Sequence, residues 1–253
     1  MRREPTLSAS PRTRAGRSLA VCVAAFTLVA GSTVLPARES ASGSGLATVL
    51  GRTEQPLRQY RAYRRMHAAT DNGKHEAWLD AWTELRNGQF SYEIVSERGS
   101  ETVRGKVLRS MLQREQELVN SGNTDKGDLT AANYDFSEAG RDADGSRVVQ
   151  IKPKRNDVLL VDGHAVLDDR GGLLRVEGRL AKNPSFWTSL VNIVRRYARI
   201  GGVRVPVATE TVAKVKMVGT SKLQVFYDYE SVNGQPVRVT ARVPAEPAHI
   251  AGQ

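Results

Sequence analysis

The chain has 253 residues, a formal net charge of +10 at pH 7 and a single cysteine, Cys22. One thiol excludes intrachain disulfides and metal sites built from several thiolates, so an ordinary hydrophobic core must stabilise the fold. The basic residues are spread along the chain and form no blocks, which argues against nucleic acid as a partner and leaves a mild preference for anionic partners such as lipid headgroups.

Residues 1–37 are interpreted as an export signal, because five arginines come before an apolar run of signal-peptide length. Cleavage after Gly31 or after Ala37 would fit the small-residue rule only approximately, so the cleavage site stays open. Cys22 lies inside the run and not behind it, which argues against lipidation. The run is nearly long enough for an uncleaved anchor, although Pro36 weakens a spanning helix. We therefore expect a periplasmic protein, with a membrane-anchored protein facing the periplasm as the alternative.

The folded part is expected to begin near residue 57. Residues 38–56 are interpreted as a flexible linker rich in Ser, Gly and Ala, residues 57–242 as one domain, and residues 243–253 as a disordered tail. Turn signals such as DNG, RNG, DADG, DDRGG, RIGG and VNG separate segments that alternate or are rich in β-branched and aromatic residues, as in an antiparallel meander. The expected strands cover residues 57–68, 90–96, 147–151, 158–167, 173–180, 186–197, 203–217 and 222–230.

One segment has the period of a helix. In residues 100–119 apolar side chains recur every three or four positions, with charges on the opposite face. Ser100 is the candidate N-cap. The pattern predicts a single amphipathic helix whose apolar stripe includes Val107, Met111 and Leu112.

Residues 75–86 fit two structures, and the choice between them stays open. Their intrinsic propensity favours a helix, whereas their position between strand signals and short turns favours a strand with Trp78 and Trp82 on one face. In either case the fold class is mainly β (α+β). We expect a curved antiparallel sheet that forms an incomplete half-barrel, with one or two helices covering the concave face.

Several stretches carry a resemblance to a group of exported bacterial proteins. They are the leader, GSETVRGKVLRSMLQRE, YDFSEAGRDADG and GRLAKNPSFWTSLVNIVRRYARIGGVRVPV. Over residues 57–234 the pattern is similar to outer-membrane lipoprotein-sorting proteins of the LolA/LolB type. The resemblance implies a half-closed barrel whose apolar concave face, covered by a helix, receives acyl chains.

The chain also departs from that family. The stretch LRQYRAYRRMHAA fits a strand with Tyr60, Ala62 and Met66 on one face about as well as it fits the family's first helix. No segment matches the exposed apolar loop with which the outer-membrane receptor of that family enters the membrane. No functional residue of the family is therefore carried over to this chain.

The strand expected at residues 186–197 carries the main candidate site. Both of its faces are apolar, unlike those of a strand that is wetted on one side. The face with Trp187 has large apolar counterparts on the strand expected at residues 222–230. We predict that this face and the helix stripe line an apolar cavity, with a packed core as the alternative. The candidate ligand-binding residues are Trp187, Val191, Ile193, Leu223, Val225, Tyr227, Tyr229, Val107, Met111 and Leu112.

No catalytic or metal site is predicted. The four histidines stand far apart without metal-binding spacing, and no GxSxG, P-loop or GxGxxG motif is present. The acidic DADG and DDRGG stretches are interpreted as hairpin turns and not as a calcium loop. Alternation places Arg195 and Arg196 of VRRYAR on opposite faces, so this stretch is interpreted as a solvated strand end.

These features predict a non-enzymatic envelope protein, without a cofactor, that binds the acyl chain of a lipid or lipoprotein. Burial of each methylene contributes about 0.8 kcal/mol, so apolar walls suffice for binding. The resemblance adds a role in lipid or lipoprotein transport to the outer membrane. The alternative is a periplasmic sensor or interaction module with a filled core. An envelope protein is the expected protein partner, and a monomer is expected.

Overall fold

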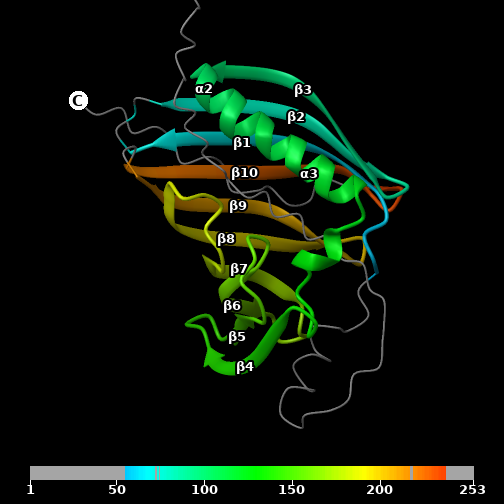
Figure 1. Ribbon diagram of the computed structural model, residues 1–253. Helices are drawn as coiled ribbons and strands as arrows, with labels where there is room; N and C mark the ends of the chain where they lie inside the picture. Colours follow the sequence, from blue (N-terminus) through cyan, green and yellow to red (C-terminus); the bar gives the residue numbers. More distant parts are fainter. Residues whose placement is uncertain (1–54, 72, 74, 217–218, 238–253) are drawn as a thin grey trace, which may run out of the picture.

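The computed structural model describes residues 55–237 except 72, 74, 217 and 218, and these residues form an open, curved antiparallel sheet (Figure 1). The predicted leader, nearly all of the predicted linker and the predicted tail lie outside the described residues. The strands are β1 (Tyr60–Thr70), β2 (Glu76–Arg86), β3 (Gln89–Gly99), β4 (Tyr134–Arg141), β5 (Arg147–Pro153), β6 (Val161–Leu167), β7 (Leu173–Leu180), β8 (Thr188–Ile200), β9 (Val203–Val215), β10 (Gly219–Val232) and β11 (Gln235–Pro236). The predicted fold class, mainly β (α+β) with a helix on the concave side, is confirmed.

The strand order in the sheet is β3-β2-β1-β10-β9-β8-β7-β6-β5-β4, with β11 added on β10. Neighbours in this order are also neighbours in the sequence, except that β1 pairs with β10. Tyr60 stands opposite Val232 and Thr70 opposite Ser221, so this pairing extends along the whole of β1. Strands β3 and β4 are the two edges of the sheet, which therefore remains open.

Residues 76–86 form strand β2 and not a helix. Ala77, Leu79 and Ala81 are fully buried, whereas Trp78 and Trp82 are only half-buried on the other face. Strand β2 is hydrogen-bonded to β1 on one side and to β3 on the other. These two ladders and the buried face outweigh the helical propensity of the segment.

The predicted helix is confirmed and lies across the concave side of β1, β2 and β3 (Figure 1). It consists of α2 (Glu101–Val103), a π-helical turn η1 (Arg104–Arg109) and α3 (Ser110–Asn120). Ser100 occupies the N-cap position but makes no side-chain capping hydrogen bond. The stripe residues Val107, Met111 and Leu112 are buried, as predicted.

Strand β4 was not among the predicted strands. Only Tyr134 of its eight residues is buried, because β4 is an edge strand with one neighbour, β5. An exposed edge strand needs no apolar alternation, so the sequence carries little strand signal there. Each predicted strand corresponds to an observed one. The bounds of residues 173–180 coincide with those of β7, and one or both ends of the others are shifted.

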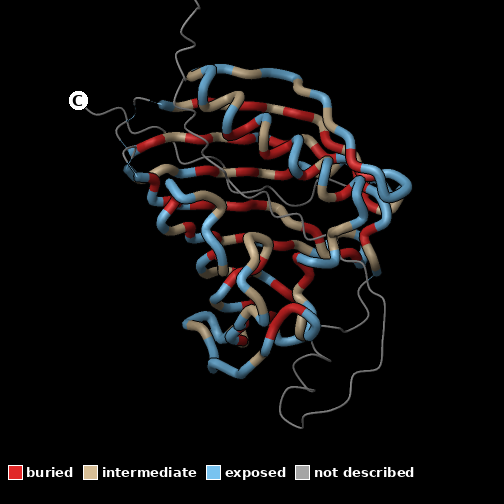
Figure 2. Tube along the Cα trace, in the orientation of Figure 1, coloured by how far each residue is buried: buried red, intermediate tan, exposed pale blue. Residues whose placement is uncertain are grey.

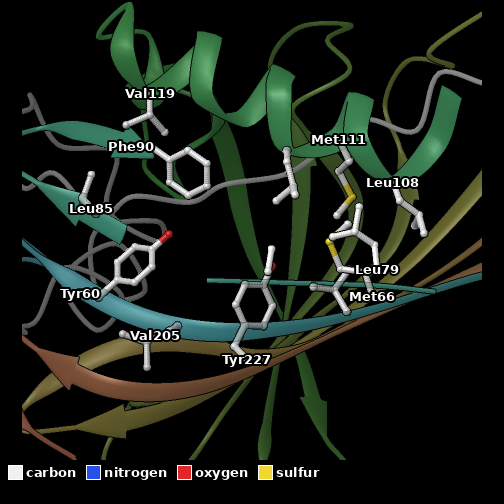
Figure 3. Close-up of a cluster of buried hydrophobic side chains, with 14 of the residues drawn as sticks. Tyr60, Met66, Leu79, Leu85, Phe90, Leu108, Met111, Val119, Val205 and Tyr227 are labelled. Carbon is white, nitrogen blue, oxygen red and sulfur yellow. The ribbon is translucent and has the colours of Figure 1, made fainter. Parts of the chain in front are cut away.

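Nearly all of the buried apolar residues described belong to one of two separate clusters. They appear as alternating buried positions along the strands in Figure 2. The helix cluster packs the helix against β1, β2, β3, β9 and β10, as Figure 3 shows in close-up. It contains Leu57, Tyr60, Ala62, Met66, Ala68, Ala77, Leu79, Ala81, Leu85, Phe90, Val107, Leu108, Met111, Leu112, Val119, Val203, Val205, Leu223, Val225, Tyr227 and Val232. The second, which we name the lower cluster, contains Tyr134, Val149, Ile151, Leu160, Val161, Ala165, Leu167, Leu173, Val176, Leu180, Val191, Ile193, Tyr197, Ala213 and Val215.

Strand β8 has one buried and one partly exposed face. Val191, Ile193 and Tyr197 are buried in the lower cluster, whereas Leu190 and Val194 on the other face are only half-buried. The apolar character of both faces therefore does not mark two buried layers. The RIGG turn is confirmed, because the two glycines between β8 and β9 have φ values of +58° and +83°.

Candidate ligand-binding site on the concave face

The helix-covered half of the concave face holds a buried ion pair. The Arg64 guanidinium donates from Nη1 to Glu115 Oε2 at 2.5 Å and from Nη2 to Glu115 Oε1 at 2.7 Å. Nη2 also donates to the Tyr60 hydroxyl at 2.8 Å. The side chains of Arg64 and Glu115 are each 2% exposed. This pair joins β1 to α3 through the middle of the helix cluster.

Aromatic rings enclose the guanidinium of this pair. The Arg64 Cζ atom lies 5.2 Å from the Phe90 ring centroid and 4.7 Å from that of Tyr227. Desolvation, the largest single effect, lowers the pKa of Arg64, but Glu115, Tyr60 and Tyr227 together raise this pKa well above its usual value. A paired charge thus occupies the place where an acyl chain would require apolar walls.

The structure divides the ten predicted cavity residues between different places. Most of them pack into the helix cluster: Val107, Met111, Leu112, Leu223, Val225 and Tyr227. Tyr229 is half-buried against that cluster and donates its hydroxyl to the Pro206 carbonyl at 2.9 Å. Val191 and Ile193 belong to the lower cluster. That these residues bind a ligand stays a prediction.

Trp187 lies apart from both clusters. It precedes β8, which begins at Thr188, and its side chain is 41% exposed. The neighbouring Phe186 is 78% exposed, and the two rings meet edge to face with centroids 5.5 Å apart. The Lys216 ammonium lies 4.1 Å from the Phe186 ring centroid. The predicted face of Trp187, Val191 and Ile193 is therefore interrupted where the strand begins.

A small apolar cavity lies within the lower cluster. Its volume of about 20 Å³ corresponds to about one water molecule. Strands β6, β7 and β8 form its floor, and the chain at the start of β4 and just before it forms its other wall. The lining residues are Leu129, Tyr134, Val161, Val176, Ile193, Arg195 and Tyr197.

Arg195 is the charged group of this cavity and corrects the sequence interpretation. The VRRYAR stretch was interpreted as a solvated strand end, but Arg195 is only 4% exposed. It shares the concave face of β8 with Ile193 and Tyr197, and its Nε donates to Thr209 Oγ1 at 3.2 Å. Arg196, on the opposite face, is exposed and pairs with Glu210, as a solvated position would.

Leu129 covers one side of the cavity and belongs to a segment that we name the strap, residues 124–133. The strap leads from the helix to β4 (Figure 1). It begins with a short 3-10 turn, η2 (Thr124–Gly127). The Asn133 side-chain amide donates to the carbonyls of Asp125 and Asp128, both at 2.8 Å.

Two basic side chains fasten the strap to the chain after β5. Arg155 Nη1 donates to Asn133 Oδ1 at 2.5 Å and its Nη2 donates to the Lys126 carbonyl. Lys154 Nζ donates to the Ala131 carbonyl at 2.7 Å. The strap is thus held mainly by polar contacts, whereas the helix is held by a broad apolar face.

Asp128 lies in the strap with its carboxyl turned away from solvent. The residue is 6% exposed, and its Oδ1 atom has no hydrogen-bond partner. Desolvation and the nearby Asp125 raise the pKa of Asp128 to about 7, while Arg204 acts in the opposite direction. Tyr134, at the end of the strap, accepts a hydrogen bond from the Val161 amide at 3.0 Å, and burial raises its pKa to about 12.

Sequence reasoning missed Arg195 and the strap residues of this site. The period of two along β8 already placed Arg195 beside Ile193, so that signal was available. Leu129 is a lone apolar residue in a polar segment, and no periodicity identifies such a residue.

The DDRGG turn and His67 have local structural roles. Asp168 Oδ1 accepts the amides of Arg170 at 2.8 Å and Gly172 at 2.7 Å, which confirms the DDRGG hairpin turn. His67 stacks on Trp78 with ring centroids 4.9 Å apart. Within the described residues no group of three or more His, Cys, Asp or Glu side chains could hold a metal ion. In the same part of the chain no helix has the length and apolar character needed to cross a membrane.

Comparison with known proteins gives low similarity. No protein-family model and no curated protein matches the chain. A LolA superfamily protein from Nitrosomonas europaea has a TM-score of 0.35 and 10% identity, covering 79% of this chain and 94% of its own. A DUF1329 family protein from Desulfovibrio piger has a TM-score of 0.32 and 12% identity, covering 80% of this chain and 96% of its own. At these values neither likeness carries an inference about what this chain binds.

Proposed function

We propose that this is a non-enzymatic envelope protein that binds the acyl chain of a lipid or lipoprotein beneath the strap. The single observation that supports it is the cavity of the lower cluster, with apolar walls on three strands and a cover held by polar contacts. The proposal includes the role in lipid or lipoprotein transport and an envelope protein that receives the ligand.

The size of the cavity defines how binding occurs. A volume of about 20 Å³ admits about one water molecule, so the strap must move before an acyl chain enters. A chain of about 16 carbons would gain on the order of 12 kcal/mol from burial, before ordering costs are subtracted. That gain is large enough to offset the loss of the few hydrogen bonds that fasten the strap.

Arg195 gives the site a polar end. Its side chain lies in the cavity wall beside Ile193 and Tyr197. A carboxylate or phosphate at the head of an amphiphile would accept hydrogen bonds from the guanidinium while the chain follows the apolar walls.

The test fills the cavity. Val176 lines it and is 8% exposed, so Val176→Trp places a ring where the acyl chain would lie. We expect the purified full chain to bind a fluorescent fatty acid and the variant to lose binding, with a nearly unchanged melting temperature because the strap moves aside. Val212→Trp is the matched control, because Val212 of β9 is 37% exposed and lies outside both clusters.

The opposite result would favour the filled-core module. In a packed core the same ring would overpack the cluster and cost about 1 to 3 kcal/mol. A wild-type protein that never binds the probe, together with a destabilised Val176→Trp variant, would refute acyl-chain binding. Native mass spectrometry of protein from an envelope fraction would identify a bound lipid by its mass.

A further inference from the structure

The strap contains a buried carboxyl group that the binding function does not require. Asp128 is 6% exposed and its Oδ1 has no hydrogen-bond partner. A buried carboxylate with an unpartnered oxygen is costly, whereas a neutral carboxyl in the same place costs much less. The closed strap therefore discriminates between the two protonation states.

Charged groups from three elements lie at the carboxyl or at the strap that carries it. Asp125 lies on the strap itself and Arg204 near the start of β9, and the two have opposite effects on Asp128. Arg155, from the segment after β5, binds the strap through the Lys126 carbonyl and the side chain of Asn133. Arg204 does not offset the desolvation, because the pKa of Asp128 is raised from 3.8 to about 7.

Asp128 is directly adjacent in the sequence to a residue that lines the cavity. Leu129, the next residue, lines the cavity. The Asp128 carbonyl accepts hydrogen bonds from the Thr130 amide at 2.9 Å and from Asn133 Nδ2 at 2.8 Å. Tyr134, which follows Asn133, lines the cavity as well. A movement of Asp128 toward solvent would thus displace both cavity residues that come from this side.

We propose that Asp128 is a proton-operated latch: the strap stays closed over the cavity while this carboxyl is neutral and opens when it is ionised. The inference rests on the proposed function for what enters the cavity, whereas the opening itself is a property of the strap. Acid would hold a ligand, and a neutral or mildly alkaline medium would release it or admit a new one.

The direction of the pH dependence follows from linkage. The group is harder to ionise in the closed strap than in an open, solvated strap, so closure is most favourable below the ordinary pKa of 3.8. The closing equilibrium then weakens by up to about tenfold per pH unit between about pH 4 and about pH 7, and is constant above that.

The first experiment measures opening without a ligand. Hydrogen exchange of the amides of residues 129–134 in the full chain, corrected for intrinsic exchange, reports the opening equilibrium. We expect opening to increase at least about tenfold from pH 5 to pH 8. Asp128→Asn, which is neutral at every pH, should abolish the increase and exchange at pH 8 at least as slowly as the wild type at pH 5. Asp125→Asn, at an exposed position of the same strap, should retain most of the increase, because desolvation of Asp128, the larger cause of its raised pKa, remains.

Two results would overturn the latch. One is a wild-type exchange profile that does not change between pH 5 and pH 8. This result is informative even if the variants do not fold. The other is an Asp128→Asn profile that keeps the full increase.

A second readout separates the latch from the proposed function. The association rate of a fluorescent fatty acid should increase with pH in the wild type and be constant in Asp128→Asn. If opening depends on pH but the probe does not bind, acyl-chain binding is refuted and the latch proposal stands. Binding of the probe without pH-dependent opening would refute the latch alone.

Discussion

The buried pair of Arg64 and Glu115 has a definite energetic role at the level of single residues. Two charges that leave water lose hydration free energy, and their mutual attraction compensates this only when the geometry is good. Here both Nη atoms of Arg64 reach carboxylate oxygens, but Nε has no partner. We infer that the main role of the pair is to determine the position of α3 on β1, and that its net contribution to the free energy of unfolding is small.

This inference predicts an asymmetric response to substitution. Glu115→Leu leaves the Arg64 charge buried without its counter-ion and should lower the free energy of unfolding by about 3 to 5 kcal/mol. The double variant Arg64→Met/Glu115→Leu removes both charges and should recover most of that loss. Denaturant unfolding of the three proteins measures the effect. A double variant less stable than the single one would contradict the inference.

The burial of Arg195 could be predicted from the sequence, whereas that of Asp128 could not. The place of Arg195 on the concave face follows from the alternation along β8, so its burial was predictable. The burial of Asp128, with its unpartnered oxygen, could not be predicted from the sequence. Burial of a residue in an irregular segment depends on which distant strands lie beneath it. The same holds for Leu129, the strap residue that lines the cavity.

At the level of elements, the helix is stabilised by its packing and not by its ends. Ser100 makes no capping hydrogen bond, while Leu108 and Leu112 are fully buried against the sheet. The apolar stripe is therefore the feature on which the helix depends.

A charge on that stripe should unfold the helix cluster. Leu112→Asp places a carboxylate among apolar side chains and should cost several kcal/mol, a large fraction of the stability of an ordinary domain. Gln113→Asp, at the adjacent exposed position, is the control and should change the melting temperature little. Equal melting temperatures of the two variants would show that Leu112 does not face the sheet.

The helix and strand β2 differ in how far sequence determines them. Residues 101–120 have one strong period, and the helix was predicted within one residue of its ends. Residues 76–86 have two competing periods, and the decision comes from β1 and β3 on either side of them. No local pattern contains that information, because it belongs to the pairing of strands. The same holds for edge strand β4, which pairs only with β5 in the sheet order.

At the level of the whole molecule, the pairing of β1 with β10 joins the two ends of the described chain. Leu223, Val225 and Tyr227 of β10 belong to the helix cluster. This strand also links the β1–β3 part of the sheet to the β4–β9 part. Its contacts are therefore needed by both halves.

Removal of β10 should prevent folding of the helix-covered half. A chain that ends at residue 215 keeps β1 to β9 but leaves one edge of β1 unpaired and the helix cluster incomplete. We expect it to show no cooperative melting and to be cut rapidly by protease within residues 57–120. A chain that ends at residue 237 is the control. Cooperative melting of the shorter chain at the temperature of the control would contradict this expectation.

The β1–β10 pairing also sets an order in time. A ribosome makes β1, β2, β3 and the helix first, and β10, the strand that completes their pairing, begins at Gly219, well after the helix ends at Asn120. Contacts between such distant parts of a chain form slowly. The hairpins from β4 to β9 can pair as each strand emerges, because their partners are adjacent in the sequence. The N-terminal third of the fold is thus the first to be synthesised and the last to be completed, and during that interval it is available to chaperones, proteases or a translocation machinery.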